Sequence, residues 1–191
     1  MSKLENQVLR TIRERRSIYG FKPDSVSDEQ IKAILEAGRW APSWTNTQPW
    51  EFIVVKDATR KEKICEIAKN TLLIVHGGSI EGCSCIIVIC VDPTRDPYHY
   101  IEDGAVATQN MALAAHSLGL STYWAGTFNL NKVEDSVEEK VKNVLKIPDQ
   151  IRVVAILPVG VPAYSKEGER RWLRDMLHYD EYGNRTEYLK L

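Results

Sequence analysis

The chain contains 191 residues, of which 43% are hydrophobic, so it can fill one core but is too short for two ordinary domains. We therefore expect residues 1–191 to form a single domain. The 25 Lys and Arg residues nearly balance the 26 Asp and Glu residues, which gives no general attraction for nucleic acid or anionic lipid and predicts neither as a partner. The first residues are polar and every apolar run is too short to cross a bilayer, so we expect a cytoplasmic protein.

Helices are predicted where apolar residues recur with a period near 3.6. The pair Ser27 and Gln30 is a capping box that starts one helix, and the Ala-rich segment from Asp103 to Leu118, closing at Gly119, predicts another. The Ala-rich segment is apolar nearly all round, which indicates burial on more than one side. The other predicted helices carry Leu4, Val8 and Ile12; Ile64, Ile67 and Ala68; and Val133, Val137, Val141 and Leu145.

Strands are predicted at four short runs, residues 52–55, 86–91, 121–124 and 153–157. Sheet and helix thus alternate along most of the chain. The tail from Ser165 onward is polar and aromatic, and it has no core periodicity. We expect its aromatic residues to pack on a partner subunit. They are Trp172, Tyr179, Tyr182 and Tyr188.

Cysteine and histidine are both interpreted as structural. Without a secretion signal, four cysteines in a chain of this size are expected to be reduced thiols in and beside a buried strand. Cys83 and Cys85 form C-x-C, which is not the paired C-x-x-C spacing of zinc sites, and the histidines also lack ligand spacing, so no metal site is predicted. The residues concerned are Cys65, Cys83, Cys85 and Cys90, and His76, His99, His116 and His178.

Two segments carry groups that could bind a ligand. Arg15, Arg16 and Ser17 place two guanidiniums and a hydroxyl on adjacent residues, which can bind a phosphate monoester, although a solvated charge run at a helix end has the same composition. A second pair, Arg170 and Arg171, is equally ambiguous alone.

The other segment is a loop from Ala41 to Trp50 that combines prolines, hydroxyls, amides and indoles directly before a predicted strand. Such groups can contact the polar edge of a planar heterocycle while the indoles give apolar cover. The sequence contains no GxGxxG, P-loop, H-E-x-x-H or nucleophile elbow. The commonest dinucleotide, phosphate, metal and acyl-transfer sites are therefore not predicted.

Short motifs also follow one another along the whole chain. They are Arg15-Arg16-Ser17 with Phe21; Ala41-Pro42-Ser43 with Asn46, Gln48, Pro49 and Trp50; Asp103-Gly104-Ala105 with Gln109-Asn110; Gly119-Leu120 leading to Trp124, Gly126 and Phe128; and Leu157-Pro158-Val159-Gly160. In order and coverage, this series resembles the flavin-dependent nitroreductase family.

The resemblance implies an α+β fold of the nitroreductase type, with a central mixed sheet flanked by helices. It also implies an intertwined homodimer that holds two FMN molecules at the subunit interface. The cofactor-binding residues that it implies are Arg15, Arg16, Ser17, Arg171 and Arg170 at the ribityl phosphate; Pro42, Ser43, Asn46 and Gln48 in a loop that reaches the partner's flavin; Gly126 against the isoalloxazine face, flanked by Trp124 and Ala125; and Tyr19 near the pyrimidine edge.

Two of these positions depart from the family pattern. Tyr19 stands where many relatives carry Lys or Arg, and Ala125 stands where several carry Glu. A cation near the pyrimidine edge would stabilise the negative charge of reduced flavin, so its loss would lower the reduction potential unless another donor compensates. His76 is a candidate for that donor.

The activity implied by the resemblance is reduction of nitroaromatics, quinones or similar small acceptors with NADH or NADPH, in a ping-pong mechanism that needs no dedicated protein acid or base. One alternative is a specialised member of the superfamily, reductive dehalogenase-like or flavin-fragmenting, although residues 130–148 leave little room for a long lid. Another is a non-catalytic flavin-binding redox sensor, in which the clustered cysteines would act.

Overall fold

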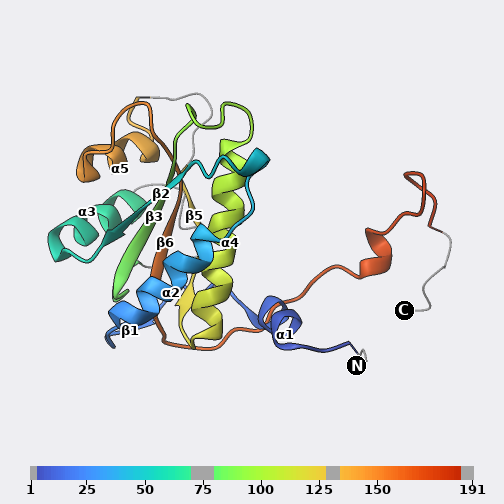
Figure 1. Ribbon diagram of the computed structural model, residues 1–191. Helices are drawn as coiled ribbons and strands as arrows, with labels where there is room; N and C mark the ends of the chain where they lie inside the picture. Colours follow the sequence, from blue (N-terminus) through green and yellow to red (C-terminus); the bar gives the residue numbers. More distant parts are fainter. Residues whose placement is uncertain (1–3, 70–79, 128–133, 186–191) are drawn as a thin grey trace.

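The computed structural model describes residues 4–69, 80–127 and 134–185. Its body is a sheet covered by helices on both faces, as Figure 1 shows, which agrees with the expected α+β class. The helices α2 and α4 pack together on one face, and α3 and α5 pack together on the other. Two segments, α1 and the tail that follows the last strand, lie outside this body.

Strand β6 is the centre of the sheet. It pairs with β3 along one side and with β1, β4 and β5 along the other, while β2 pairs with β3 at the far edge. Every ladder among the described residues is antiparallel, and the parallel part of the expected mixed sheet is a single bridge between Ser17 and Thr122. The strands are β1 (Phe21–Lys22), β2 (Trp50–Val55), β3 (Cys85–Val91), β4 (Ser121–Thr122), β5 (Ala125–Gly126) and β6 (Arg152–Pro162).

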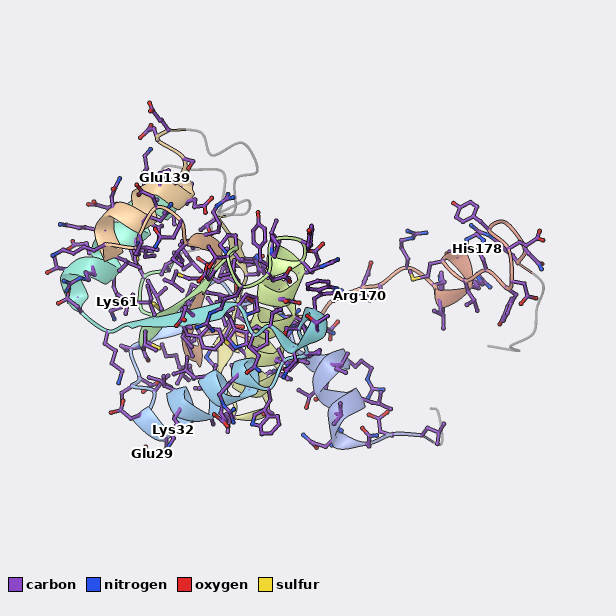
Figure 2. The ribbon with its side chains drawn as sticks, turned by 45° about the horizontal axis from the view of Figure 1, so that its top comes forward. Glu29, Lys32, Lys61, Glu139, Arg170 and His178 are labelled. Atoms are coloured by element: carbon purple, nitrogen blue, oxygen red, sulfur yellow. The ribbon has the colours of Figure 1, made fainter. Side chains whose placement is uncertain are left out.

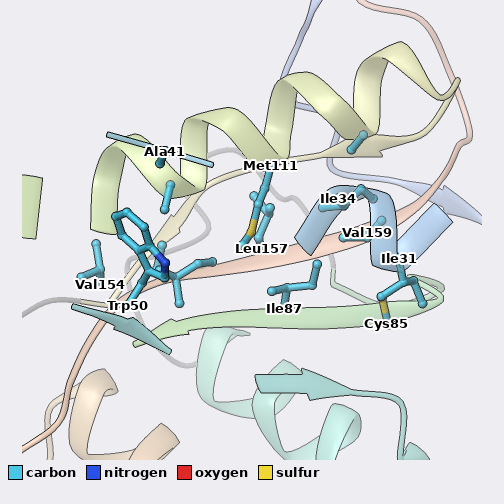
Figure 3. Packing of buried hydrophobic residues seen from close by; sticks show 14 of the residues in the cluster. Ile31, Ile34, Ala41, Trp50, Cys85, Ile87, Met111, Val154, Leu157 and Val159 are labelled. Carbon is cyan, nitrogen blue, oxygen red and sulfur yellow. The ribbon is translucent and has the colours of Figure 1, made fainter. Parts of the chain in front are cut away.

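Strand β3 divides the protein interior into two cores. All seven of its residues are buried, which confirms the strand predicted from a continuous apolar run. Because side chains alternate along a strand, Ile87 and Ile89 join the core under α2 and α4, whereas Ile86 and Val88 join the core under α3 and α5. Figure 3 shows the first core, with Ile87 beneath the helices.

The helices largely confirm the sequence predictions. They are α1 (Gln7–Glu14), α2 (Asp28–Arg39), α3 (Ala58–Lys69), α4 (Tyr100–Ser117) and α5 (Val137–Leu145), with short 3-10 turns η1 (Trp44–Asn46) and η2 (Leu173–Asp175). Both halves of the capping box between Ser27 and Gln30 are present. Gly119 has a φ of 75°, a left-handed conformation that suits glycine after a helix. None of the helices in the described ranges is long and apolar enough to span a membrane.

The strand predicted at residues 121–124 was wrong in its extent. β4 and β5 lie on one continuous register along β6, but pairing stops at Tyr123 and Trp124, opposite Pro158 and Leu157. Proline has no backbone N–H to donate, so Pro158 interrupts the ladder at this point.

Two residues predicted on helices are not part of the helices described. Leu4 lies before the first helix, which Asn6 caps, and Val133 lies outside the described residues.

Apolar side chains are exposed on the segments outside the body. Leu4, Val8 and Ile12 are 80%, 64% and 52% exposed, although they form the apolar side of the predicted first helix. In the tail, Trp172 is 72% exposed and Tyr182 is 95% exposed. An apolar surface of this kind marks an interaction site in a soluble protein.

A buried ion pair fixes α5 to the first residue of β6. The carboxylate of Glu138 accepts two hydrogen bonds from the Arg152 guanidinium, at 2.7 and 2.8 Å, and a third from the backbone N–H of Val153 at 3.0 Å. Both side chains are almost fully buried. The hydrogen bonds to Glu138 raise the pKa of Arg152 and keep the pair ionised.

Arg152→Met should lower the free energy of unfolding by about 3–5 kcal/mol, because it leaves the Glu138 charge buried without its partner. The double variant Glu138→Leu/Arg152→Met should recover much of this loss, since neither charge then remains. Urea denaturation at one fixed protein concentration measures both. A single variant as stable as the unmodified protein would show that the pair does not hold α5 in place.

Candidate cofactor site

The cationic residues predicted at the first helix lie together with one from the tail. The chain leaves α1 at Arg15 in an extended conformation and is tied to the sheet by the Ser17–Thr122 bridge and by a hydrogen bond from the Ile18 N–H to the Thr122 carbonyl. Partial burial, followed by the nearby charges of Arg170 and Arg16, lowers the pKa of Arg15. The guanidiniums of Arg170 and Arg16 therefore both repel the charge on Arg15.

Hydrogen bonds distinguish the members of this cationic cluster, which consists of Arg15, Arg16 and Arg170. One terminal nitrogen of Arg16 donates to the carbonyls of Arg13 and Arg15, at 2.5 and 2.9 Å, whereas its buried Nε has no partner among the described residues. Figure 2 shows Arg170 on the segment that leads from the body into the tail. The structure thus brings Arg170 near Arg15, while Arg171 donates to the Asp175 carbonyl within the tail at 3.2 Å.

A cluster of like charges with an unused buried donor is suited to an anion. Guanidiniums bind phosphate oxygens through charge-assisted hydrogen bonds, and the hydroxyl of Ser17 lies on the same stretch of chain. An anion would also offset the repulsion that lowers the pKa of Arg15. The residues present therefore fit a terminal phosphate group.

The position of Tyr19, where a cation was expected to be missing, has the ammonium group of Lys166 beside it. Its backbone N–H donates to the Tyr164 hydroxyl at 3.1 Å, and its ring centroid lies 4.7 Å from that of Tyr123. The ammonium of Lys166 lies 5.5 Å from the Tyr19 centroid. Sequence reasoning missed Lys166 because nothing local connects it with Tyr19, while the donor suggested there, His76, lies outside the described residues.

The short strand β5 leaves open space beside its glycine. Ala125 is buried, whereas Gly126 is exposed and Trp124 is 42% exposed. Among the described residues, a Cβ built on Gly126 would meet Trp124 atoms alone, at 3.6 and 3.9 Å, which is ordinary contact. This part of the sheet can therefore admit a flat group against the backbone without disturbing its own chain.

Within the predicted heterocycle loop, Ala41 to Trp50, residues 42–48 have an unusual backbone. Thr45, Asn46 and Gln48 all have positive φ, at 45°, 62° and 49°. The Ser43 hydroxyl accepts from the Gln48 N–H at 3.0 Å, and the Gln48 side-chain amide donates to Asn46. Pro42, Asn46 and Gln48 are exposed. Left-handed conformations are rare for such residues and concentrate at functional sites.

The loop and the cationic cluster lie at opposite ends of α4. Trp44 of the loop contacts Asp103 in the first turn, whereas Arg16 lines a cavity of about 230 Å³ with His116 and Gly119 at the other end. The thirteen residue steps of helix from Asp103 to His116 span roughly 20 Å at 1.5 Å per residue. The structure therefore does not bring all the predicted residues together within one chain.

All four cysteines are buried thiols outside any disulfide, as predicted. Burial raises the pKa of Cys83 and Cys90 to about 12 and that of Cys85 to about 11. These thiols therefore stay protonated at neutral pH and do not resemble reactive thiolates.

Comparison with known proteins identifies the family of the chain. The profile of the Nitroreductase family matches residues 12–79 and 79–161. A relative in Archaeoglobus fulgidus, provisionally named NADH dehydrogenase/NAD(P)H nitroreductase, is 33% identical over 182 residues, covering 92% of this chain and 99% of its own.

Solved structures show the same fold. A crystal structure from Parabacteroides distasonis, with the same provisional name, has a TM-score of 0.82 at 29% identity and covers 93% of this chain and 100% of its own. A structure from Desulfovibrio desulfuricans, provisionally called a nitroreductase and solved with FMN, has a TM-score of 0.75 at 30% identity over 93% of this chain and 99% of its own. The chain belongs to the nitroreductase family.

Proposed function

We propose that two copies of this chain form an FMN-dependent oxidoreductase that uses NADH or NADPH to reduce small acceptors such as nitroaromatics and quinones. The observation that carries the proposal is the cationic cluster, where Arg170 comes near Arg15 and the buried Arg16 Nε has no partner among the described residues. When bound, FMN supplies the redox chemistry, taking electrons from the nicotinamide and giving them to the acceptor. The named FMN-bound structure from Desulfovibrio desulfuricans supports this choice of cofactor.

The protein's part is to hold the cofactor and leave one side of it open. Arg15, Arg16, Ser17 and Arg170 would bind the terminal phosphate, since charged donors to phosphate give the strongest hydrogen bonds. The exposed backbone at Gly126 would lie against the ring system, with Trp124 as an apolar neighbour. The sequence has no glycine-rich loop for an adenylate, which favours FMN over FAD.

The site requires a second subunit on this proposal. The loop that carries Ser43 and Asn46 is separated from the cationic cluster by most of α4, so the loop would serve the partner's flavin. The exposed apolar residues on α1 and on the tail provide surface for the partner. A groove of about 430 Å³ between α1, α2 and α4, lined by Val8, Trp40 and Leu113, extends this surface. An intertwined homodimer would cover all three.

The buried thiols argue against the sensor alternative. A redox-sensing cysteine needs thiolate character and access, whereas Cys83, Cys85 and Cys90 are buried with raised pKa values. α5 is a short helix held to β6 by the Glu138–Arg152 pair and does not form a lid. A general reductase is therefore favoured over a lidded specialist.

Arg15→Ala should weaken FMN binding about 10- to 100-fold, because it removes charged hydrogen bonds worth roughly 1.5–3 kcal/mol. Arg16→Ala should also weaken it if Nε contacts the phosphate. FMN fluorescence on titration into flavin-free protein measures the affinity. Arg60→Ala is the matched control, since Arg60 is an exposed cation on α3 whose side chain pairs with Asp57. Affinity unchanged by Arg15→Ala would remove this residue from the phosphate site.

Ile12→Asp should dissociate the dimer and release FMN with it, because obligate interfaces bury more than about 2,000 Å² of largely apolar surface and tolerate a new charge poorly. Truncation after Asp180 should weaken dimer association and FMN binding in the same way if the tail packs on the partner. Light scattering coupled to flavin absorbance follows the two together. Asn143→Asp, on an exposed position of α5, is the control. A flavin-loaded monomer would contradict the proposal.

Gly126→Val should depress turnover strongly while changing thermal stability little, because the added carbons make ordinary contacts with the described residues and point into the space proposed for the ring. Donor and acceptor would occupy that space in turn in the unmodified protein. Reciprocal plots of its initial rate against NADH or NADPH concentration, at several fixed acceptor concentrations, should therefore give parallel lines. Converging lines would show a ternary complex. If neither nicotinamide bleaches the bound flavin, the reductase assignment is wrong.

A further inference from the structure

The segment that connects β6 to the tail, residues 163–170, lies antiparallel to the chain that follows α1. At its start the Ala163 N–H donates to the Gly20 carbonyl at 3.1 Å, and further on Gly168 lies against Arg16. Residue numbers thus rise along one segment while they fall along the other, as in the pairing of β1 with β6 that comes just before. In Figure 1 this connecting segment passes beside α1 before it reaches the tail. It therefore extends the pairing from the sheet to the cationic cluster.

Gly168 is in contact with the guanidinium end of Arg16. A Cβ built on Gly168 would lie 2.6 Å from Arg16 Nε, 3.1 Å from Cδ and 3.3 Å from Cζ. The first distance is below 3.0 Å, a separation that real Cβ atoms essentially never show, so any side chain here would displace the guanidinium. The φ of Gly168 lies outside the left-handed region, so its backbone conformation is open to other residues. Glycine is therefore required here by the space that Arg16 occupies.

The Arg16 guanidinium is held on another side by the end of α1. Its Nη1 donates to the carbonyls of Arg13 and Arg15, at 2.5 and 2.9 Å, and carbonyls at the end of a helix have no partner within the helix. The buried Nε is the donor left over, since it has no partner among the described residues. A buried donor of this kind is normally satisfied, so Nε is suited to an acceptor atom of a ligand.

The connecting segment also lines the cavity at the end of α4. Lys166 and Ser165 border this space of about 230 Å³ together with Arg16. A water molecule takes up about 30 Å³ in the liquid, so the cavity has room for a phosphate group. Its described lining residues include two permanent cations, Arg16 and Lys166, and one carboxylate, Glu14. An anion bound beside Arg16 would therefore meet groups from the connecting segment as well as from α1.

We propose that Gly168 is a positioning residue for the phosphate site. Because it has no side chain, the connecting segment can close against Arg16 and keep the guanidinium where Nε is able to donate to a terminal phosphate. The identity of that phosphate as part of FMN rests on the proposed function. Since Gly168 acts through Arg16 alone, its effect is confined to ligands that carry a phosphate.

The test uses the full-length protein, freed of flavin, as unmodified chain, Gly168→Ala, Arg16→Ala and the double variant. FMN and riboflavin are titrated into each protein and followed by flavin fluorescence. Riboflavin is the matched ligand, because it has the same ring and ribityl chain but lacks the phosphate. The double variant is the matched protein control, because without the Arg16 side chain the new methyl group has none of its three neighbouring atoms to displace.

Gly168→Ala should weaken FMN binding about tenfold and change riboflavin binding less than about twofold, as expected for the loss of one charge-assisted hydrogen bond to the phosphate. Its melting temperature should stay close to that of the unmodified protein, since Gly168 is exposed and the methyl group meets the end of a flexible side chain. In the Arg16→Ala background the same substitution should have no further effect on FMN binding.

Three results would overturn the inference. They are unchanged FMN affinity in Gly168→Ala, an equal loss of FMN and riboflavin affinity, and a loss of FMN affinity that persists in the Arg16→Ala background. The first removes Gly168 from the site, the second shows a general effect on the fold, and the third shows an effect that does not pass through Arg16.

Inorganic phosphate separates this inference from the proposed cofactor. A ligand that binds the folded state raises the melting temperature, so phosphate should stabilise the flavin-free unmodified protein more than Gly168→Ala at the same concentration. If neither flavin binds while this difference is present, the proposed function fails and the role of Gly168 stands. If neither flavin binds and phosphate stabilises both proteins equally, both fail.

Discussion

Strand β6 forms hydrogen bonds with four other strands, and most of the proposed site depends on those ladders. Its residues from Arg152 to Gly160 are all buried, so its position is determined by both cores at once. β5, with Gly126, and β4, which carries the bridge to Ser17, are both attached to its free side. The proposed ring-binding backbone and the proposed phosphate site are therefore both attached to β6, and their separation would be insensitive to movements of the surface helices.

A single chain leaves this arrangement incomplete in two ways. It exposes apolar surface on α1 and the tail, and it places the heterocycle loop at the far end of α4 from the cationic cluster. The proposed homodimer would meet both deficits at once, through a two-fold symmetric association in which each loop reaches the other subunit's site. Binding of the cofactor and association of subunits would then stabilise each other, because each provides contacts that the other needs.

Local patterns could be predicted from the sequence, and long-range pairings could not. The capping box at Ser27 and the continuous apolar run of β3 depend on neighbours in sequence, and both are confirmed. The nearness of Arg170 to Arg15 was expected only from the family resemblance, and that of Lys166 to Tyr19 was not expected at all, because both depend on where the chain turns after β6, which no periodicity records. The break between β4 and β5 is similar, because its cause is Pro158 on another strand.

Helix α4 connects the heterocycle loop with the cationic cluster, because one lies at each of its ends. Its first turn restrains the loop through Asp103, and its last turn lies beside the cavity that Arg16 lines. The Ala-rich composition that predicted burial all round also lets the helix lie close to α2 and the sheet, so it behaves as a rigid spacer. The strained loop conformation can persist at the end of such a helix, because the Asp103 carboxyl group that binds the loop is held in place by the helix. A flexible support would let the left-handed residues relax, and the loop would lose the conformation proposed to contact the partner's cofactor.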